Sequence, residues 1–365
     1  MRIPYLYFTS LLVVLSSCMK DDLLWNKPPS LEVLPIEGVF VINEGNFMYE
    51  NASLSFYDLE KEEVYNDLFF ESTGIPLGDL AQSISIRDSL AYIVLNNSGK
   101  IQIFNIHTFQ YSGKITGFTS PRYIHFLDNH KAYVSDLYAR SISIIDPAAS
   151  EISGSIPVDN HEHALQQHST EQFVQYDKYV FTNCWSNDRQ ILVIDSEADM
   201  LVDSIQVIKQ PQSMVIDRFN KIWTLSDGGY EGSPYGYEAP GLTRINAVSR
   251  EVEYVYRLDL EDYPSELTLN GSGDTLYFIN KNIYRMPVIS EGEPELVFEN
   301  TRQEGYFGGF SALGVDPFSS EIYVADAMDY IQRGVVYRLS PAGIPIDTFK
   351  AGIIPGAFAF KASAQ

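Results

Sequence analysis

The chain has 365 residues, a length that suggests about two or three ordinary domains. It carries 25 Lys and Arg against 48 Asp and Glu, a formal net charge of −23. This charge excludes nucleic acid and anionic membrane surfaces as partners, because both bind basic surfaces. The hydrophobic fraction of 45% excludes a disordered chain, and two cysteines exclude a disulfide scaffold or a cysteine-rich metal site.

Residues 1–17 have the pattern of an export signal. Arg2 supplies a positive start, and an apolar run over residues 11–15 follows that is too short to span a bilayer. Residues 15–18 (LSSC) resemble a bacterial lipobox, whose cysteine becomes the lipidated first residue of the mature chain. We therefore expect lipidation at Cys18; the alternative is an ordinary secreted protein with a chance cysteine.

The segment after Cys18 has the features of a surface tether. Asp21 and Asp22 follow closely, as in the surface-export signals of Bacteroidota lipoproteins. Residues 18–36 are rich in proline and charge and lack a regular pattern, which predicts a flexible tether. No other hydrophobic stretch approaches 18 residues, so we expect no transmembrane helix. The predicted location is the outer membrane, with the lipid as the only membrane contact and the domain facing the cell exterior.

Residues 37–361 repeat one pattern seven times. Each repeat starts with a similar short segment, and the second residue of this segment recurs every 40 to 53 residues, a range typical of propeller blades. The markers are Gln82, Arg122, Gln172, Gln212, Ser265, Ser311 and Gly356.

Each repeat predicts four short strands. In the second repeat they cover residues 82–87, 90–95, 100–106 and about 111–115, separated by Gly, Asn and Asp turns. We find no convincing long helical periodicity.

The two ends of the repeat region complete each other. The first repeat (38–43, 52–58, 63–69) lacks its first strand, and residues 355–361 form a first strand with nothing after it. Pairing them closes the ring and leaves no sheet edge. The prediction is an all-β fold, one seven-bladed β-propeller closed by the C-terminal strand. A pair of β-sandwiches is the alternative, but sandwiches do not require this period.

The predicted ligand site lies on the loops around the central channel. Where the second strand of each blade ends, the chain carries Asn or Asp: Asn43, Asn96, Asp136, Asn183, Asp227, Asn280 and Asp326. Asx residues also make turns, which is the competing interpretation. The same loops add polar and aromatic candidates: Glu44, Asn46, Asn97, Tyr138, Trp185 and Tyr330.

The longest insertion, residues 228–241, holds Tyr230, Tyr235 and Tyr237 on a glycine-rich frame. Rigid aromatics on such a frame favour recognition, although the loop could instead pack on itself. At the starts of the innermost strands we expect a polar ring of Gln82, Arg122, Gln172, Gln212 and Glu266. Amides that donate and accept, beside flat aromatic faces, predict a large, partly flat ligand rich in hydrogen-bonding groups.

Weaker candidates concern metals and a thiol. His161, His163 and His168 could hold a structural zinc ion, although a solvated loop is the simpler interpretation. Carboxylates at Glu44, Asp227 and Asp326 lack the spacing of a calcium loop. Cys184 is expected to be a small buried apolar residue. No GxSxG, P-loop or HExxH motif is present.

Several segments are similar to a known family. They are residues 41–46 (VINEGN), 51–58 (NASLSFYD), 119–126 (TSPRYIHF), 227–240 and 353–358 (IIPGAF). On them, residues 37–361 resemble the YVTN/DUF5074-type propeller lipoproteins of Bacteroidota, and among these the BtuG type. The resemblance implies capture of cobalamin or a related corrinoid at the cell surface and delivery to a TonB-dependent outer-membrane transporter. The corrinoid would be a transported ligand and not a cofactor.

Two other functions compete with this one. Tyr230, Tyr235, Tyr237 and Trp185 could stack on sugar rings of a surface glycan. A propeller hydrolase or lyase would need a metal in the channel, held by Glu44 and by Asn or Asp side chains. Because no acid–base or base–nucleophile pair stands out, the sequence predicts a binding protein and not an enzyme.

Overall fold

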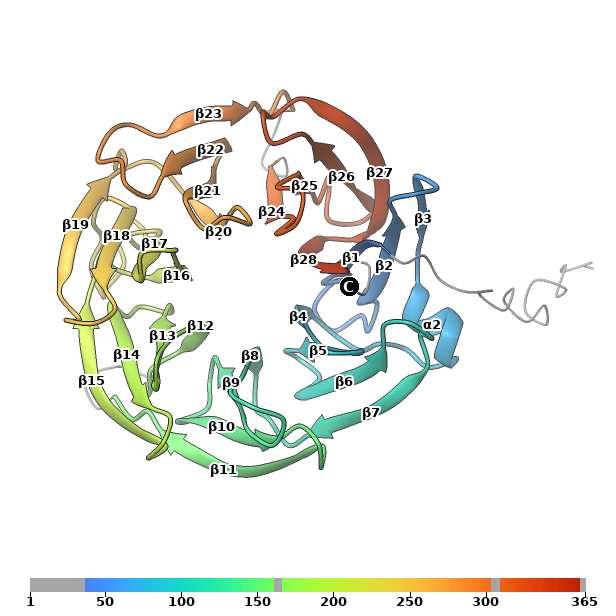
Figure 1. The fold of residues 1–365 in the computed structure, drawn as a ribbon, viewed down its shortest axis with the longest axis horizontal. Coiled ribbons are helices and arrows are strands. Elements are labelled where there is room, and N and C mark those ends of the chain that lie inside the picture. Colours follow the sequence, from blue (N-terminus) through green and yellow to red (C-terminus); the bar gives the residue numbers. More distant parts are fainter. Residues whose placement is uncertain (1–36, 161–165, 303–308, 362–365) are drawn as a thin grey trace, which may run out of the picture. The chain divides into compact units, whose positions relative to one another are not determined.

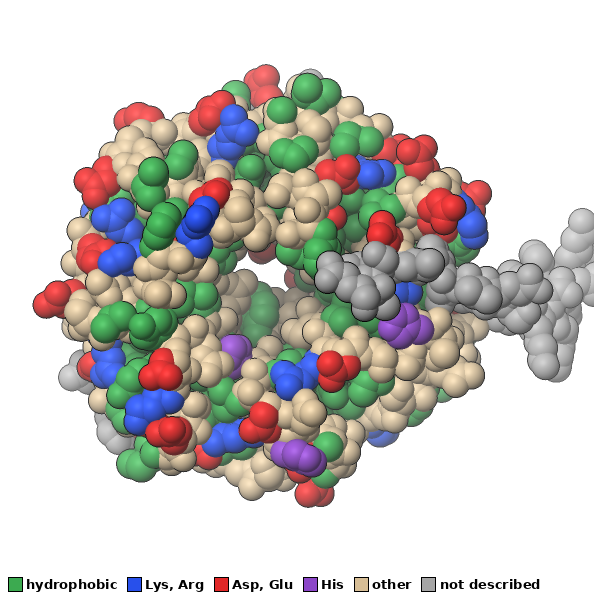
Figure 2. Space-filling model, in the orientation of Figure 1, with side chains coloured by type: hydrophobic (Ala, Val, Ile, Leu, Met, Phe, Trp, Pro, Cys, Tyr) green, Lys and Arg blue, Asp and Glu red, His purple; other side chains and the backbone are tan. Residues whose placement is uncertain are grey.

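The computed structural model describes residues 37–160, 166–302 and 309–361. The predicted export signal, Cys18, the tether, His161 and His163 lie outside these residues. Within them, seven four-stranded antiparallel sheets surround a central opening (Figure 1), which is also visible in the space-filling view (Figure 2). The predicted seven-bladed propeller is confirmed, and it is nearly all β.

Each blade runs from an inner strand A, beside the opening, to an outer strand D. In the order A to D, blade 1 consists of β28 (Pro355–Lys361), β1 (Gly38–Asn43), β2 (Ser53–Asp58) and β3 (Glu63–Tyr65). Blade 2 consists of β4 (Ala81–Arg87), β5 (Leu90–Leu95), β6 (Lys100–Asn105) and β7 (Tyr111–Thr116). Blade 3 consists of β8 (Pro121–Phe126), β9 (Ala132–Asp136), β10 (Ser141–Asp146) and β11 (Glu151–Pro157).

The remaining blades follow in chain order. Blade 4 consists of β12 (Thr170–Tyr176), β13 (Tyr179–Cys184), β14 (Gln190–Asp195) and β15 (Met200–Gln206). Blade 5 consists of β16 (Pro211–Ile216), β17 (Lys221–Ser226), β18 (Gly241–Asn246) and β19 (Val252–Arg257). Blade 6 consists of β20 (Ser265–Leu269), β21 (Thr275–Asn280), β22 (Asn282–Pro287) and β23 (Glu295–Phe298). Blade 7 consists of β24 (Phe310–Val315), β25 (Ile322–Asp326), β26 (Arg333–Leu339) and β27 (Pro345–Ile353).

The hydrophobic core lies between blades. In the described part of the chain, buried apolar side chains form seven clusters, and each draws on two neighbouring blades. Between blades 1 and 2, for example, Phe40 lies 4.7 Å from Phe56 and 5.8 Å from Phe104 (ring centroids). Burying one such ring contributes roughly 1.5–3 kcal/mol. Because both faces of each sheet are covered, the B strands are mainly apolar, and β5 (LAYIVL) is apolar throughout.

The ring closes as the sequence predicts. Strand β28 pairs antiparallel with β1, with Val39 opposite Phe360 and Val41 opposite Phe358. Both phenylalanines contact Tyr323 of blade 7: the ring centroid of Phe358 lies 6.1 Å from that of Tyr323, and the centroid of Phe360 lies 5.4 Å from it. The last strand therefore protects the edge of β1 and joins blade 1 to blade 7.

One element of blade 1 differs from the prediction. Residues 63–69 were expected to form a strand, but β3 ends at Tyr65 and the helix α2 (Leu68–Thr73) follows. Asp67 has left-handed backbone (φ 54°), which breaks the strand, and Phe69 then packs into the core from the helix. No helix among the described residues is long and apolar enough to cross a membrane.

The two faces of the ring carry different connections. We call the face with the B-to-C and D-to-A connections the loop face; it includes residues 44–52, 137–140, 227–240, 258–264 and 327–332. The opposite face, with the A-to-B and C-to-D turns, is the turn face. Strand β1 begins at the turn face and ends at the loop face.

Candidate functional site

All seven A strands carry the same irregularity at the loop face. Each pairing of an A strand with its B strand shifts register near the start of the A strand. Such β-bulges re-aim side chains and are common next to functional sites. With Glu44 from the adjoining loop, the bulge residues form what we call the channel mouth: Glu44, Gln82, Arg122, Tyr123, Glu171, Gln172, Gln212, Glu266, Ser311 and Gly356.

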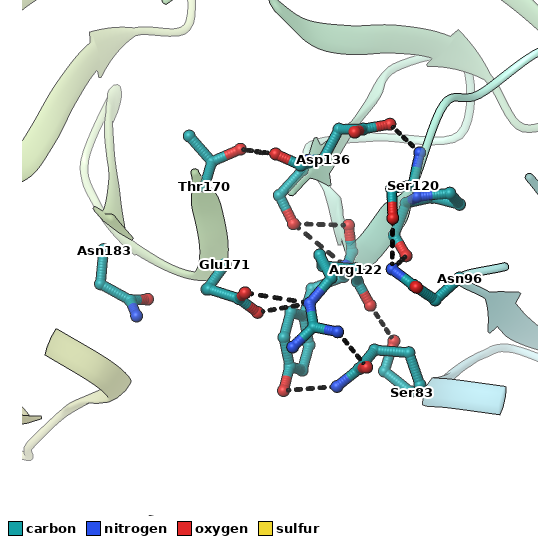
Figure 3. Close-up of polar contacts among 12 residues, drawn as sticks. Ser83, Asn96, Ser120, Arg122, Asp136, Thr170, Glu171 and Asn183 are labelled. Atoms are coloured by element: carbon teal, nitrogen blue, oxygen red, sulfur yellow. Dashed lines mark hydrogen bonds and ion pairs between the residues drawn. The ribbon is translucent and has the colours of Figure 1, made fainter. Parts of the chain in front are cut away.

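Arg122 is fixed at the channel mouth by two neighbouring blades (Figure 3). Its Nε donates to both carboxylate oxygens of Glu171, at 2.9 and 2.8 Å, and its Nη1 donates to Oε1 of Gln82. The hydroxyl of Ser83 donates to the Arg122 carbonyl at 2.7 Å. Burial would lower the pKa of Arg122, but the charge of Glu171 holds that pKa above its ordinary value. The guanidinium is therefore a permanent, well-oriented cation.

Glu44 and Glu266 lie in the same mouth without such a partner. Burial raises the pKa of Glu266 to about 8; the charge of Glu44 adds to the rise and that of Arg122 opposes it. Burial also raises the pKa of Glu44, again against Arg122. Neither carboxyl makes a hydrogen bond to another described residue. At neutral pH Glu266 is therefore mostly protonated, and a raised pKa of this kind is typical of functional sites.

Glu44 depends on a glycine in the last strand. A Cβ atom at Gly356 would lie 2.9 Å from Cγ of Glu44, closer than such atoms approach. The missing side chain at the β28 bulge therefore leaves room for Glu44 to cross that strand.

The predicted amides of the channel mouth are used mainly to join blades. Oε1 of Gln172 accepts from the backbone N–H of Met214 at 2.7 Å, and Gln212 donates to the carbonyl of Pro264. Ser311 likewise donates to the Pro355 carbonyl at 2.8 Å. These contacts fix the geometry of the mouth and leave the carboxyls of Glu44 and Glu266 open.

The Asx residues at the ends of the B strands are part of the framework. Five are buried and offer no open surface in this structure, so a ligand contact at them stays a prediction: Asn43, Asn96, Asp136, Asn183 and Asp326. Asp136 shows the reason, because its Oδ2 accepts from the backbone N–H of Ser120 at 2.8 Å and its Oδ1 from that of Tyr138 at 2.9 Å (Figure 3). Turn chemistry, the competing interpretation, accounts for Asp136 and also for Asp326, whose Oδ1 accepts from the N–H of Met328. The three asparagines instead join blades: Asn96 donates to the Pro121 carbonyl, Asn183 donates to the Pro211 carbonyl, and Asn43 accepts from the N–H of Gly352.

The other polar candidates lie at or near the surface. Asn97 is exposed and donates to Asp79 at 2.6 Å, and Asn280 is half-buried. Asn46 donates to the Tyr330 carbonyl at 2.8 Å and so joins the loops of blades 1 and 7. Asp227 accepts from the indole N–H of Trp185 at 2.9 Å, and burial raises the pKa of its carboxyl.

Exposed aromatic side chains gather on the loop face. We call them the aromatic rim, and their exposed fractions run from 38% to 76%: Phe47, Tyr49, Tyr138, Tyr230, Tyr235, Tyr263 and Tyr330. Tyr237 is half-buried and donates to the carbonyl of Leu260. Among the described residues the turns of the opposite face expose only two aromatic rings, Phe219 and Phe318.

Several members of this site were not predicted. Phe47 and Tyr49 lie in the loop after β1, and Tyr263 lies in the connection before β20; the aromatic residue type itself was the available signal. Glu171 and Tyr123 are adjacent in the chain to predicted residues. Each lies in a bulge, where two residues of the A strand lie opposite one residue of the B strand. A bulge leaves no mark in the repeat pattern, so the sequence did not separate these neighbours.

A cavity of about 450 Å³ opens beside the aromatic rim, between blades 7 and 1. Its lining comes from separate stretches of the chain and includes Leu54, Phe69, Phe70, Leu77 and Ile331. Arg333 and Asp67 also line it and pair at 2.6 Å. The helix α2 supplies part of the lining, so the sequence analysis could not foresee this cavity without that helix.

The histidine and thiol candidates meet in blade 4. Ligand atoms of His168, Cys184 and Asp188 lie within 4.8 Å of one another. Nδ1 of His168 lies 2.6 Å from Oδ2 of Asp188, which is a hydrogen-bond distance. Cys184 is fully buried, and this burial raises the pKa of its thiol well above the ordinary value, as expected for a buried apolar residue. The calcium candidates Glu44, Asp227 and Asp326 belong to three different blades.

Solved structures share this fold at low sequence identity. A quinonprotein alcohol dehydrogenase-like protein from Bacteroides thetaiotaomicron VPI-5482 is 14% identical, with a TM-score of 0.68 over 91% of this chain and 79% of its own. The periplasmic gluconolactonase PpgL of Pseudomonas aeruginosa is 13% identical, with a TM-score of 0.67 over 90% and 99%. The dihydro-heme d1 dehydrogenase NirN is 9% identical, with a TM-score of 0.59 over 89% and 66%. No curated protein matches the chain.

These structures correct one prediction. The prediction that the protein is not an enzyme, which rests on the lack of an acid–base or base–nucleophile pair, is contradicted, because propellers named as a gluconolactonase and a dehydrogenase have the same fold. At such identities the likeness concerns the fold alone, and a fold does not by itself decide whether a protein is an enzyme. The family described as "Domain of unknown function (DUF5074)" matches residues 37–335. The chain therefore belongs to the DUF5074 family of β-propellers.

Proposed function

We propose that this protein captures a corrinoid such as cobalamin on its loop face. The observation that carries the proposal is the aromatic rim, because seven exposed rings lie on the loop face, whereas the described residues of the turn face expose Phe219, Phe318 and, at the start of β7, Tyr111. Aromatic side chains cover large apolar surface at low entropic cost. The charged groups of the channel mouth lie inside this rim. A flat macrocycle fringed with amides fits both parts.

The remaining parts of the proposal concern location and delivery. A lipid at Cys18 would anchor the protein to the outer membrane, and a TonB-dependent transporter would receive the ligand. Because β1 starts at the turn face, a tether of residues 18–36 would join the ring there. The loop face would then be free to meet ligand from outside.

Binding of cyanocobalamin by calorimetry tests the proposal. We expect binding by the wild type and a loss of about tenfold or more for Tyr138→Ala and Tyr230→Ala, because exposed tyrosines of this kind are frequent binding hot spots. Phe219→Ala and Phe318→Ala are the matched controls on the turn face and should bind like the wild type. No heat with cyanocobalamin, or equal binding by the rim variants, contradicts the proposal. Heat with a surface glycan instead would support the glycan-binding alternative.

The channel mouth favours a second candidate function, the hydrolysis of a cyclic ester. In that reaction a water attacks the ring carbonyl and Glu44 takes the proton of the water. Arg122 stabilises the oxyanion, and Glu266 gives its proton to the ring oxygen as the C–O bond breaks. A carboxyl with a pKa of about 8 is suited to the acid role near neutral pH.

Acid release from glucono-1,5-lactone, followed at constant pH, tests this second function. We expect catalysis that Glu266→Gln reduces by about 100-fold and Glu151→Gln, an exposed outer-strand change, leaves intact. A rate equal to that of buffer for this lactone and for larger lactones contradicts it.

A further inference from the structure

Three ionisable side chains of the channel mouth keep open hydrogen-bonding atoms. Arg122 uses Nε for Glu171 and Nη1 for Gln82, and its Nη2 has no hydrogen bond to a described residue. The carboxyls of Glu44 and Glu266 are likewise without one. By contrast, Gln172 and Gln212 are occupied by backbone partners. The mouth therefore offers one donor-only group and two carboxyls.

This set matches one functional group better than others. A primary carboxamide has a carbonyl oxygen that accepts and an NH₂ that donates twice. A guanidinium only donates, and an ionised carboxyl only accepts, so the two ends of the amide would each meet a complementary group. A carboxylate on the ligand would instead meet net negative charge, since Glu171 already neutralises Arg122 and Glu44 adds a further carboxyl. An ammonium group would leave Nη2 of Arg122 unsatisfied.

We infer that the channel mouth receives one primary carboxamide arm of the bound ligand, a propionamide, with its oxygen on Arg122 and its NH₂ between Glu44 and Glu266. This inference rests on the proposed corrinoid capture, because a corrinoid presents several such arms around its ring. The aromatic rim would hold the flat body, and the mouth would fix its rotation by selecting one arm. The site is rigid, since bulges and inter-blade hydrogen bonds hold the residues around it.

Corrinoids that differ in a single arm test the inference. The probes are cyanocobalamin and its three monoacids, in each of which one propionamide arm has been hydrolysed to a carboxylate. We expect one monoacid to bind about 30-fold or more weakly than cyanocobalamin, because a site built to hydrogen-bond a group rejects its mismatched analogue strongly. The other two should bind about as well as the parent. Glu44→Gln should recover part of the lost affinity for that one monoacid, and the exposed control Glu151→Gln should recover none.

The possible outcomes distinguish a failure of this inference from a failure of the proposed corrinoid capture. If cyanocobalamin binds and all three monoacids bind as well as it does, the inference is wrong while corrinoid capture stands. If the weak monoacid is equally weak with Glu44→Gln and Glu266→Gln, the selected arm does not lie in the mouth and the inference is again wrong. If cyanocobalamin itself does not bind, both the inference and the proposed function are wrong.

Discussion

Glu266 is held in the channel mouth at a cost to the fold. Its backbone is left-handed, with φ of 58°, and such a conformation costs a non-glycine residue about 1–3 kcal/mol. Neighbouring contacts maintain it: the N–H of Leu267 donates to Ser213 at 3.0 Å, and Gln212 donates to the Pro264 carbonyl. Its carboxyl lies among Glu44, Arg122 and Tyr123. A strained backbone and a raised pKa at one residue together indicate a functional position.

Glu266 should make stability fall as the pH rises. Its pKa is raised from 4.5 to about 8 in the folded chain, so the folded protein holds the proton more tightly than the unfolded chain does. This contribution is complete below about pH 4.5 and is lost as the pH rises through about 8. Glu266→Gln removes it. Between pH 5 and pH 9 the free energy of unfolding should therefore fall by about 4 kcal/mol more in the wild type than in the variant.

Urea unfolding at pH 5, 7 and 9 measures this difference. Glu151→Gln, an exposed change on β11, is the control and should follow the wild-type profile. Parallel profiles for the wild type and Glu266→Gln would show that Glu266 ionises near its ordinary pKa.

At the scale of elements, the sequence predicted strands better than side-chain exposure. The B strands are mainly apolar and the turns carry Gly, Asn and Asp, so the existence and the order of the strands follow from the local sequence pattern. Whether the Asx residue after each B strand faces a ligand depends on register and on the neighbouring D-to-A connection. Asp136, for example, is buried by Thr119 and Ser120, which precede it by a whole hairpin.

The helix α2 and the bulges are likewise features that the local sequence pattern does not predict. The segment 68–73 is too short to show helical periodicity, and its fold is set by the burial of Leu68 and Phe69 between blades. A bulge adds one residue to a strand without changing its composition. The sequence therefore predicted most of the ring of residues at the channel mouth but neither the pairing of Arg122 with Glu171 nor the isolation of Glu266.

At the scale of the whole molecule, stability depends on the joint between the two ends of the repeat region. Without β28, the edge of β1 and its fully buried residues Val39, Phe40, Val41 and Ile42 would lose their cover. The cluster between blades 7 and 1 would lose Phe358 and Phe360 as well. Each of the other six blades is a separate sheet with its own hydrogen bonds. The loss of β28 would therefore destabilise them through the side-chain packing between blades and not through strand pairing.

A chain ending at Ile354 should therefore fail to form a stable ring. We expect its melting temperature to fall by about 10 °C or more, or cooperative unfolding to disappear, because several large apolar side chains are exposed at once. A chain ending at Lys361 is the control and should melt like the full chain. A synthetic peptide of residues 353–361, added in trans, should restore part of the loss by pairing with β1. Equal melting of the two shortened chains would mean that the ring does not depend on β28, and that the blade contacts alone hold blade 1 in place.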